Sequence, residues 1–186
     1  MMEQTLKDMM TLTGLSEKDY EILRKYAPQL ELWADALVTV FYDTLYAYEP
    51  TAAVFQDNER KTREGTLKAW YLAVVKGNYD KHFWEQQWTV GLIHIAKRVT
   101  NPYMLGMTSR LQQVFLNKCL CTFSQSETEQ VYGAFKRMTD TIAGIIAEGY
   151  FINYIQAMEN IGGFKQPLLQ RMMALEIDKK LAALRS

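Results

Sequence analysis

Apolar residues recur at intervals of three and four along almost the whole chain, and strict alternation of apolar and polar residues is essentially absent. The first spacing is typical of an α-helix with one buried face, whereas the second marks a half-buried strand. The pattern therefore predicts an all-α protein. Capping residues, glycines and prolines divide the chain into helices that we expect at residues 16–26, 29–48, up to 76, 79–98, 101–123, 127–160 and 167–184.

Several boundary signals are specific enough to be tested. Pro28 is expected to break a helix, because proline lacks an N–H donor and clashes with the preceding turn. Gly77 is expected to end a helix in the left-handed conformation. Ser126 and Glu129 have the spacing of a capping box and would begin the longest helix, which Gly162-Gly163 would end.

Size and charge narrow the class of protein. A chain of 186 residues can bury a sizeable core, and its 21 basic and 21 acidic residues are evenly spread, so a nucleic-acid partner is not expected. No apolar run approaches the roughly 20 residues that span a bilayer, and the N-terminus lacks a signal-peptide core, so we expect a cytoplasmic protein without a membrane partner. Cys119 and Cys121, two residues apart on one helix, are expected to be packing residues and not a disulfide.

The chain has only two histidines, and one of them, His94, lies in an apolar helical run from Trp88 to Arg98. Neutral imidazole is the commonest nitrogen ligand of metals, including haem iron. Taken alone, such a histidine is more often a hydrogen-bonded core residue. His82 precedes His94 by twelve residues and is expected to be exposed.

Tyr42 is the second candidate. Val38, Phe41, Tyr42 and Leu45 share one helical face, which would carry the Tyr42 hydroxyl inward. The ordinary alternative is a buried tyrosine that donates to a backbone carbonyl. Phe55, an isolated aromatic in a polar turn region, must pack on something, either a pocket or the end of the core. No nucleophile triad, Gly-rich phosphate loop or His/Cys metal cluster is present in the sequence.

Three blocks follow one another along the chain: Phe41-Tyr42-Asp43, then residues 70–80, which begin with Trp70 and end with Gly77-Asn78-Tyr79-Asp80, then Val90-Gly91-Leu92-Ile93-His94. Pro102-Tyr103 and Gly106 come next. In this order they resemble the globin domain of globin-coupled sensors and protoglobins, over about residues 15–155. The chain differs from that pattern at Tyr103-Met104, where many members have Trp-Tyr, so the side chain that supports His94 is unassigned.

The resemblance implies a globin fold, the three-over-three helical sandwich, with an extra N-terminal helix and an additional C-terminal helix. It divides the chain into a sensor globin domain at residues 1–160 and an amphipathic helix or linker to an output domain at residues 161–186. It implies haem b (iron protoporphyrin IX), with His94 as proximal iron ligand and Tyr42 as the distal donor to dioxygen. It further implies these pocket residues: Phe41, Phe55, Thr66, Leu67, Val90, Tyr103, Met104 and Met107.

By the same resemblance the protein would bind dioxygen, CO or NO reversibly and act as a gas sensor in signal transduction. It would form a homodimer through the last two globin helices and act on an output domain or signalling partner. Two alternatives stay open from the sequence. One is a haem enzyme with peroxidase, nitrite or NO chemistry, and the other is a haem-free signalling module with a globin fold.

Overall fold

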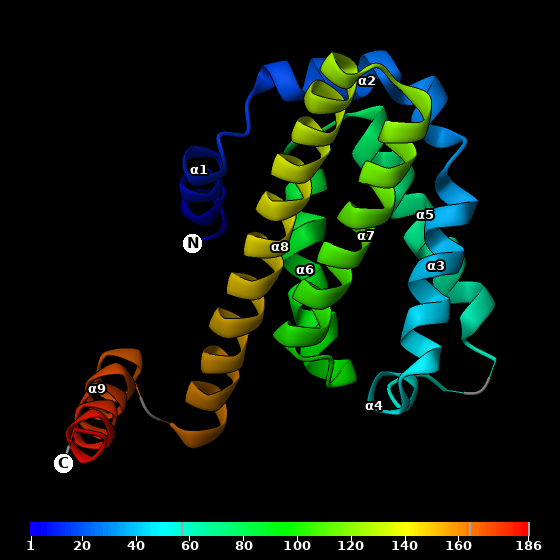
Figure 1. The fold of residues 1–186 in the computed structure, drawn as a ribbon. Helices are drawn as coiled ribbons and strands as arrows, with labels where there is room; N and C mark the ends of the chain where they lie inside the picture. The colour runs from blue at the N-terminus through cyan, green and yellow to red at the C-terminus, as the bar shows by residue number, and fades with distance from the viewer. Residues whose placement is uncertain (57, 164, 186) are drawn as a thin grey trace.

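The computed structural model describes residues 1–56, 58–163 and 165–185, and within these ranges the backbone forms α-helices and no strand (Figure 1). The all-α prediction is therefore confirmed. The helices are α1 (Met2–Thr13), α2 (Glu17–Glu31), α3 (Ala34–Ala47), α4 (Glu49–Ala52), α5 (Arg60–Lys76), α6 (Lys81–Lys97), α7 (Asn101–Thr122), α8 (Gln125–Gly162) and α9 (Gln166–Ala183).

The longest helix, α8 with 38 residues, organises the fold. It packs against α6 and α7 along much of its length and against α1 and α2 toward its N-terminal end (Figure 1). The α3 and α5 helices pack on each other at the other side of the molecule, and α2 crosses one end. The predicted extra N-terminal helix, α1, and the additional C-terminal helix, α9, are both present. The α1 helix packs on α8, whereas α9 extends away from the body after the end of α8 (Figure 1).

Buried side chains form two separate hydrophobic clusters. The larger one joins α2, α3, α5, α6, α7 and α8 and includes Phe115 and Phe135, whose rings stack with centroids 3.7 Å apart. The smaller one consists of Val38, Tyr42, Leu45 and Met107, with partly buried aromatics around it. The division matters because a cavity described below is lined by members of both clusters.

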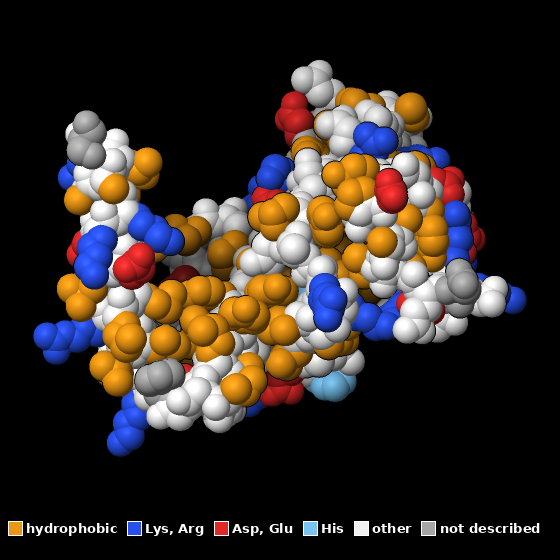
Figure 2. All heavy atoms as spheres, turned by 90° about the horizontal axis from the view of Figure 1, so that it is seen from below, with side chains coloured by type: hydrophobic (Ala, Val, Ile, Leu, Met, Phe, Trp, Pro, Cys, Tyr) orange, Lys and Arg blue, Asp and Glu red, His pale blue; other side chains and the backbone are white. Residues whose placement is uncertain are grey.

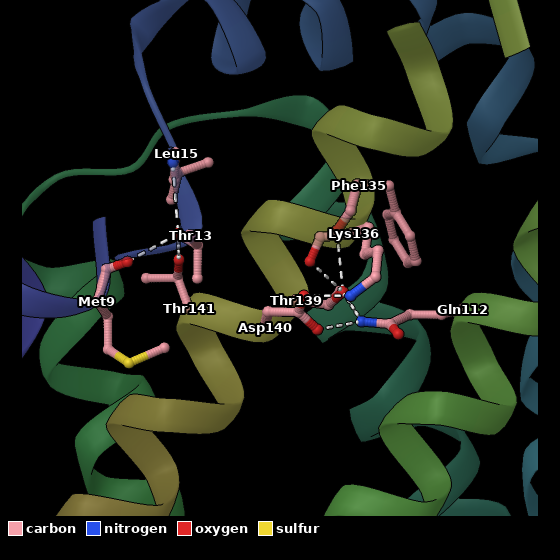
Figure 3. A network of polar contacts seen from close by, with 9 residues as sticks. All are labelled: Met9, Thr13, Leu15, Gln112, Phe135, Lys136, Thr139, Asp140 and Thr141. Atoms are coloured by element: carbon pink, nitrogen blue, oxygen red, sulfur yellow. Dashed lines mark hydrogen bonds and ion pairs between the residues drawn. The ribbon is translucent and has the colours of Figure 1, made fainter. Parts of the chain in front are cut away.

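Polar side chains fix the neighbours of α8 in register (Figure 3). Gln112 of α7 is buried, and its Nε2 atom donates to Thr139 Oγ1 at 2.9 Å and to Asp140 Oδ1 at 2.6 Å. On the other side of α8, the hydroxyl oxygens of Thr13 and Thr141 are 2.9 Å apart. These bonds satisfy polar groups that burial would otherwise leave unpaired, so they specify which residues of α1 and α7 face α8.

Most predicted boundaries are confirmed. Ser16 begins α2 with a capping box to Asp19. Gly77 and Gly163 are left-handed C-caps, with φ angles of 74° and 69°.

Two predicted boundaries are wrong. Pro28 lies inside α2, which continues to Glu31 because the next turn buries Leu30 completely and the break comes only before the buried Trp33. Hydrophobic burial there outweighs the cost of a proline in a helix, about 3 kcal/mol. The capping box of α8 uses Ser124 and Glu127, two residues before the predicted pair.

The cysteines, the surface of α9 and the polarity of the helices bear on further predictions. Cys119 is a buried packing residue as expected, whereas Cys121 is exposed, and both thiols are free. The side chains of α9 are almost all exposed along its described length. Within the described ranges, no helix combines the length and apolar character needed to cross a membrane.

Candidate functional site

A cavity of about 310 Å³ opens between α3, α5, α6 and α7, within the size range of small-molecule sites. All ten side chains predicted from the sequence line this cavity. The fold therefore brings together residues up to 66 positions apart in the sequence, from Phe41 to Met107. The predicted members are Phe41, Tyr42, Phe55, Thr66, Leu67, Val90, His94, Tyr103, Met104 and Met107. Further apolar lining comes from Leu45, Val54, Trp70, Ile93, Val99, Leu111 and Ile146.

Glycines set the position of α6, which carries His94. A Cβ atom on Gly91 would lie 2.6 Å from the backbone nitrogen of Tyr150, and one on Gly149 would lie 2.9 Å from the carbonyl oxygen of Trp88. The two backbones therefore touch where α6 crosses α8, which only glycine permits. His94 follows one turn later, so this crossing fixes the height at which its ring meets the cavity.

The two ring nitrogens of His94 have different surroundings. Nδ1 is buried and has no hydrogen-bond partner among the described residues. Nε2 makes no hydrogen bond there either, and the His94 side chain lines the cavity. Burial lowers the pKa of His94 below its ordinary value, which keeps the imidazole neutral and leaves Nε2 a lone pair for a ligand bond. The ordinary alternative, a hydrogen-bonded core histidine, does not occur at His94 among the described residues.

Tyr42 on α3 contributes a phenol to the same cavity. Its side chain is 6% exposed, and its hydroxyl has no hydrogen-bond partner among the described residues. Two other tyrosines use their hydroxyls in the ordinary way: the buried Tyr71 donates to the Leu30 carbonyl at 2.8 Å, and the half-buried Tyr79 donates to the Val74 carbonyl. Burial raises the pKa of Tyr42 to about 12, so the group is an uncharged O–H donor at neutral pH. Tyr42 therefore offers a free hydrogen-bond donor to the cavity.

Aromatic contacts hold the Tyr42 ring in place. The rings of Phe41 and Phe55 meet it nearly edge-on, at centroid distances of 5.3 Å and 5.9 Å. Phe55 also stacks on Tyr46 at 5.1 Å, which explains why a lone aromatic occurs in a polar connection. These contacts restrict the direction of the Tyr42 hydroxyl.

The remaining predicted residues have simpler roles in the wall. Met104 is buried in the larger cluster and Met107 in the smaller one, so α7 joins the two across the cavity. Leu67 packs against the smaller cluster. The Thr66 hydroxyl donates to the Thr62 carbonyl at 3.1 Å, so its proton is used within α5.

Sequence reasoning missed three charged residues of the lining, Glu59, Arg63 and Lys97. Glu59 Oε1 accepts from Arg63 Nη2 at 3.2 Å and from Lys97 Nζ at 3.3 Å. The Gln56 backbone N–H and the Arg63 side chain lower the pKa of Glu59. The side chains are 22%, 31% and 36% exposed, so they lie at the mouth of the cavity. The four-residue spacing of Glu59 and Arg63 was the one signal in the sequence.

The fold and this cavity define a class, a globin-like helical protein with an internal ligand site, and comparison with known proteins identifies the family. Residues 2–155 match the Protoglobin family, to which the chain belongs. A relative from Halobacterium salinarum, "Heme-based aerotactic transducer HemAT", is 36% identical over 104 residues, which cover 54% of this chain and 21% of the relative. The match thus spans about a fifth of that relative's length.

Solved structures confirm the globin fold. The globin domain of a Geobacter sulfurreducens globin-coupled sensor aligns with a TM-score of 0.71 at 20% identity, covering 77% of this chain and 96% of that domain. The ferric globin domain of E. coli DosC aligns with a TM-score of 0.65 at 16% identity, covering 78% and 99%. The predicted family and fold are both correct.

Proposed function

We propose that the chain is a haem-binding gas sensor, in which haem b occupies the cavity, the His94 Nε2 atom is its axial ligand and the Tyr42 hydroxyl faces the gas. The observation that carries the proposal is the pairing of two unpartnered groups in one largely apolar cavity. A neutral imidazole nitrogen and an uncharged phenol donor both reach that space. The H. salinarum relative, which is heme-based by name, supports the same assignment.

The donor set suits a metal that brings its own equatorial ligands. Within the described residues no group of three or more His, Cys, Asp or Glu side chains could hold a bare metal ion. A single imidazole is sufficient for an iron porphyrin, whose four pyrrole nitrogens complete the plane. Apolar walls from α3, α5, α6 and α7 then cover the macrocycle.

When bound, the iron porphyrin supplies one open axial position for dioxygen, CO or NO. The residues of the chain decide which gas is preferred. Tyr42 donates a hydrogen bond to a polar gas such as dioxygen, worth about 1 kcal/mol or somewhat more in an apolar site, and gives CO much less. Phe41 and Phe55 hold that donor in place and keep bulk water from it.

The signalling role extends to a partner and to the parts of the chain. We assign residues 1–160 to the sensor globin and residues 161–186 to a helix that leads to a cytoplasmic output domain or partner. The homodimer would form through α7 and α8. In support, the C-terminal half of α8 exposes Phe151, Tyr154, Met158 and Ile161. Figure 2 shows that hydrophobic side chains gather on this face, between α9 and the body of the molecule.

The test is a visible spectrum of the purified chain after haem reconstitution, in the oxidised and reduced states. We expect a Soret band, binding of dioxygen and CO to the reduced protein, and loss of the axial ligand in His94→Ala. His82→Ala is the matched control, because His82 is the other histidine, is exposed and shares a hydrogen bond with the exposed Gln86. Failure to take up haem, or an unchanged spectrum in His94→Ala, would overturn the proposal.

A further inference from the structure

The charged side chains of the cavity lining are confined to one place. Among the described lining residues these are Glu59, Arg63 and Lys97, and the rest of the wall is neutral. Glu59 is the N-cap of α5, Arg63 lies one turn later, and Lys97 is in the last turn of α6. Lys97 comes three residues after His94, so both project from the same side of α6. The cavity therefore has a neutral interior and one ionic edge.

The charges at this edge are not balanced. One carboxylate oxygen, Glu59 Oε1, serves both cations, at 3.2 Å from Arg63 Nη2 and 3.3 Å from Lys97 Nζ. The other oxygen, Oε2, accepts from the Gln56 backbone N–H at 3.3 Å. Two positive groups thus share a single negative one, and the guanidinium keeps donors to spare for a second carboxylate.

This arrangement matches the chemistry of one ligand edge. Haem b is apolar around most of its perimeter and carries two propionate carboxylates on one side. Burying that side in the neutral interior would strand two charges, whereas placing it at the mouth pairs them with cations that are still partly in water. The neutral interior of the cavity thus matches the apolar part of haem b, and the ionic edge matches its propionates.

We propose that Arg63 and Lys97 bind the two haem propionates and that Glu59 holds these cations at the mouth until the propionates displace its carboxylate. This inference rests on the proposed function and deepens it. In the ligand-free protein the Glu59 contacts tie the start of α5 to the end of α6 across the mouth. On haem uptake, Arg63 and Lys97 exchange their contacts with Glu59 for contacts with the propionates, so the haem then links α5 to α6.

The test measures haem loss from the loaded protein to excess apomyoglobin, followed in the Soret region. Haem uptake is followed by quenching of the tryptophan fluorescence, to which Trp70 in the cavity wall contributes. Each measurement is made with haem b and with its dimethyl ester, which lacks the two charges. The variants are Arg63→Met, Lys97→Met and Glu59→Gln. Lys97→Arg is the conservative variant, and Arg60→Met is the control, because Arg60 pairs with Asp43 and Glu64 outside the cavity lining.

We expect Arg63→Met and Lys97→Met each to speed haem loss by about tenfold, the equivalent of one charge-assisted hydrogen bond. The ester should leave the wild type and both variants at one common, faster rate. Lys97→Arg and Arg60→Met should keep the wild-type rate. Glu59→Gln should slow haem loss several-fold, because it removes a competing carboxylate that also repels the propionates.

Other results would overturn the inference. Equal acceleration for haem and for its ester would mean that Arg63 and Lys97 only support the fold, and unchanged rates in both variants would mean that they do not contact the propionates. A wild type that retains the ester as well as haem would also contradict it. If the wild type takes up neither compound, the proposed function fails and this inference fails with it, a result distinct from the others.

Discussion

The Nδ1 atom of His94 and the Oδ1 atom of Asn101 are the two buried side-chain polar atoms that lack a hydrogen-bond partner in the part of the chain that the structure describes. They flank the turn between α6 and α7, which folds back on itself, since the Val99 N–H donates to the His94 carbonyl at 2.9 Å. An imidazole that ligates a metal through Nε2 carries its proton on Nδ1, where it needs an acceptor. We expect the Asn101 Oδ1 atom, at the start of α7, to become that acceptor in the haem-loaded protein.

We expect Asn101→Ala to have opposite consequences in the two states of the protein. In the ligand-free protein it removes an acceptor without a partner, so urea unfolding should give an unchanged or slightly higher free energy, by about 1 kcal/mol at most. In the haem-loaded ferrous protein it should lower the iron–histidine stretching frequency in resonance Raman spectra. Thr100→Ala is the control, because the Thr100 side chain makes no capping bond. A destabilised ligand-free protein with an unchanged Raman band would contradict the pairing.

Tyr42→Phe should separate ligand binding from stability. The Tyr42 hydroxyl has no partner to lose among the described residues, so the free energy of unfolding of the ligand-free protein should change little. Dioxygen should dissociate about tenfold faster, the equivalent of one hydrogen bond of about 1.4 kcal/mol, and CO dissociation should change much less. Stopped-flow displacement and flash photolysis measure these rates.

Tyr71→Phe is the matched control for that experiment. It removes a buried bond to the Leu30 carbonyl at 2.8 Å and should cost about 1 kcal/mol of stability. It should leave gas dissociation unchanged, because Tyr71 does not line the cavity. The reverse pattern in the two variants would remove Tyr42 from the ligand site.

The raised pKa of Tyr42 predicts a pH dependence in the alkaline range. Burial raises the pKa of Tyr42 to about 12, whereas an unfolded tyrosine ionises near its ordinary pKa of about 10. Between these values the folded protein binds more protons than the unfolded one, so stability falls as pH rises through this window and is complete below it. Tyr42→Phe should make the decline in urea unfolding free energy less steep, while Tyr20, whose pKa burial also raises to about 12, still contributes to it. An equally steep decline in the variant would show that the Tyr42 hydroxyl ionises normally.

The sequence was sufficient for ten residues of the neutral wall of the site, and the reason is physical. His94, Tyr42 and the aromatics around them lie on apolar helical faces, and such faces turn inward in any helical bundle. The helix break predicted at Pro28 was wrong, because burial of Leu30 against distant parts of the chain outweighs the local tendency of proline to end a helix. Tertiary contacts of this kind leave no local pattern.

The charged mouth could not be predicted for a related reason. Glu59, Arg63 and Lys97 occur in polar stretches whose side chains are ordinarily solvated, and only the fold brings the start of α5 to the end of α6. Asn101 looked like part of a helix start, and its unpaired oxygen became visible only from its surroundings. Periodicity predicts which side chains turn inward, but it does not reveal which of them stay unpaired.

The contact between α6 and α8 gives the most demanding stability prediction. A Cβ atom on Gly91 would lie 2.6 Å from the Tyr150 nitrogen and 2.7 Å from the Ile146 carbonyl oxygen, both backbone atoms that cannot turn away. Gly91→Ala should therefore force the helices apart and lower the free energy of unfolding by about 1–3 kcal/mol, despite the better helix propensity of alanine. Because His94 follows one turn later, haem should also be lost faster.

Gly106→Ala is the control for that substitution and should have the opposite sign. Gly106 lies inside α7, and a Cβ atom there would meet nothing within 4 Å, so only the gain in helix propensity remains, about 0.5–1 kcal/mol. Urea unfolding of the ligand-free proteins measures both changes, and transfer to apomyoglobin measures haem retention. If Gly91→Ala were as stable as Gly106→Ala, α6 and α8 would not be in backbone contact, and the position of His94 would depend on something other than this crossing.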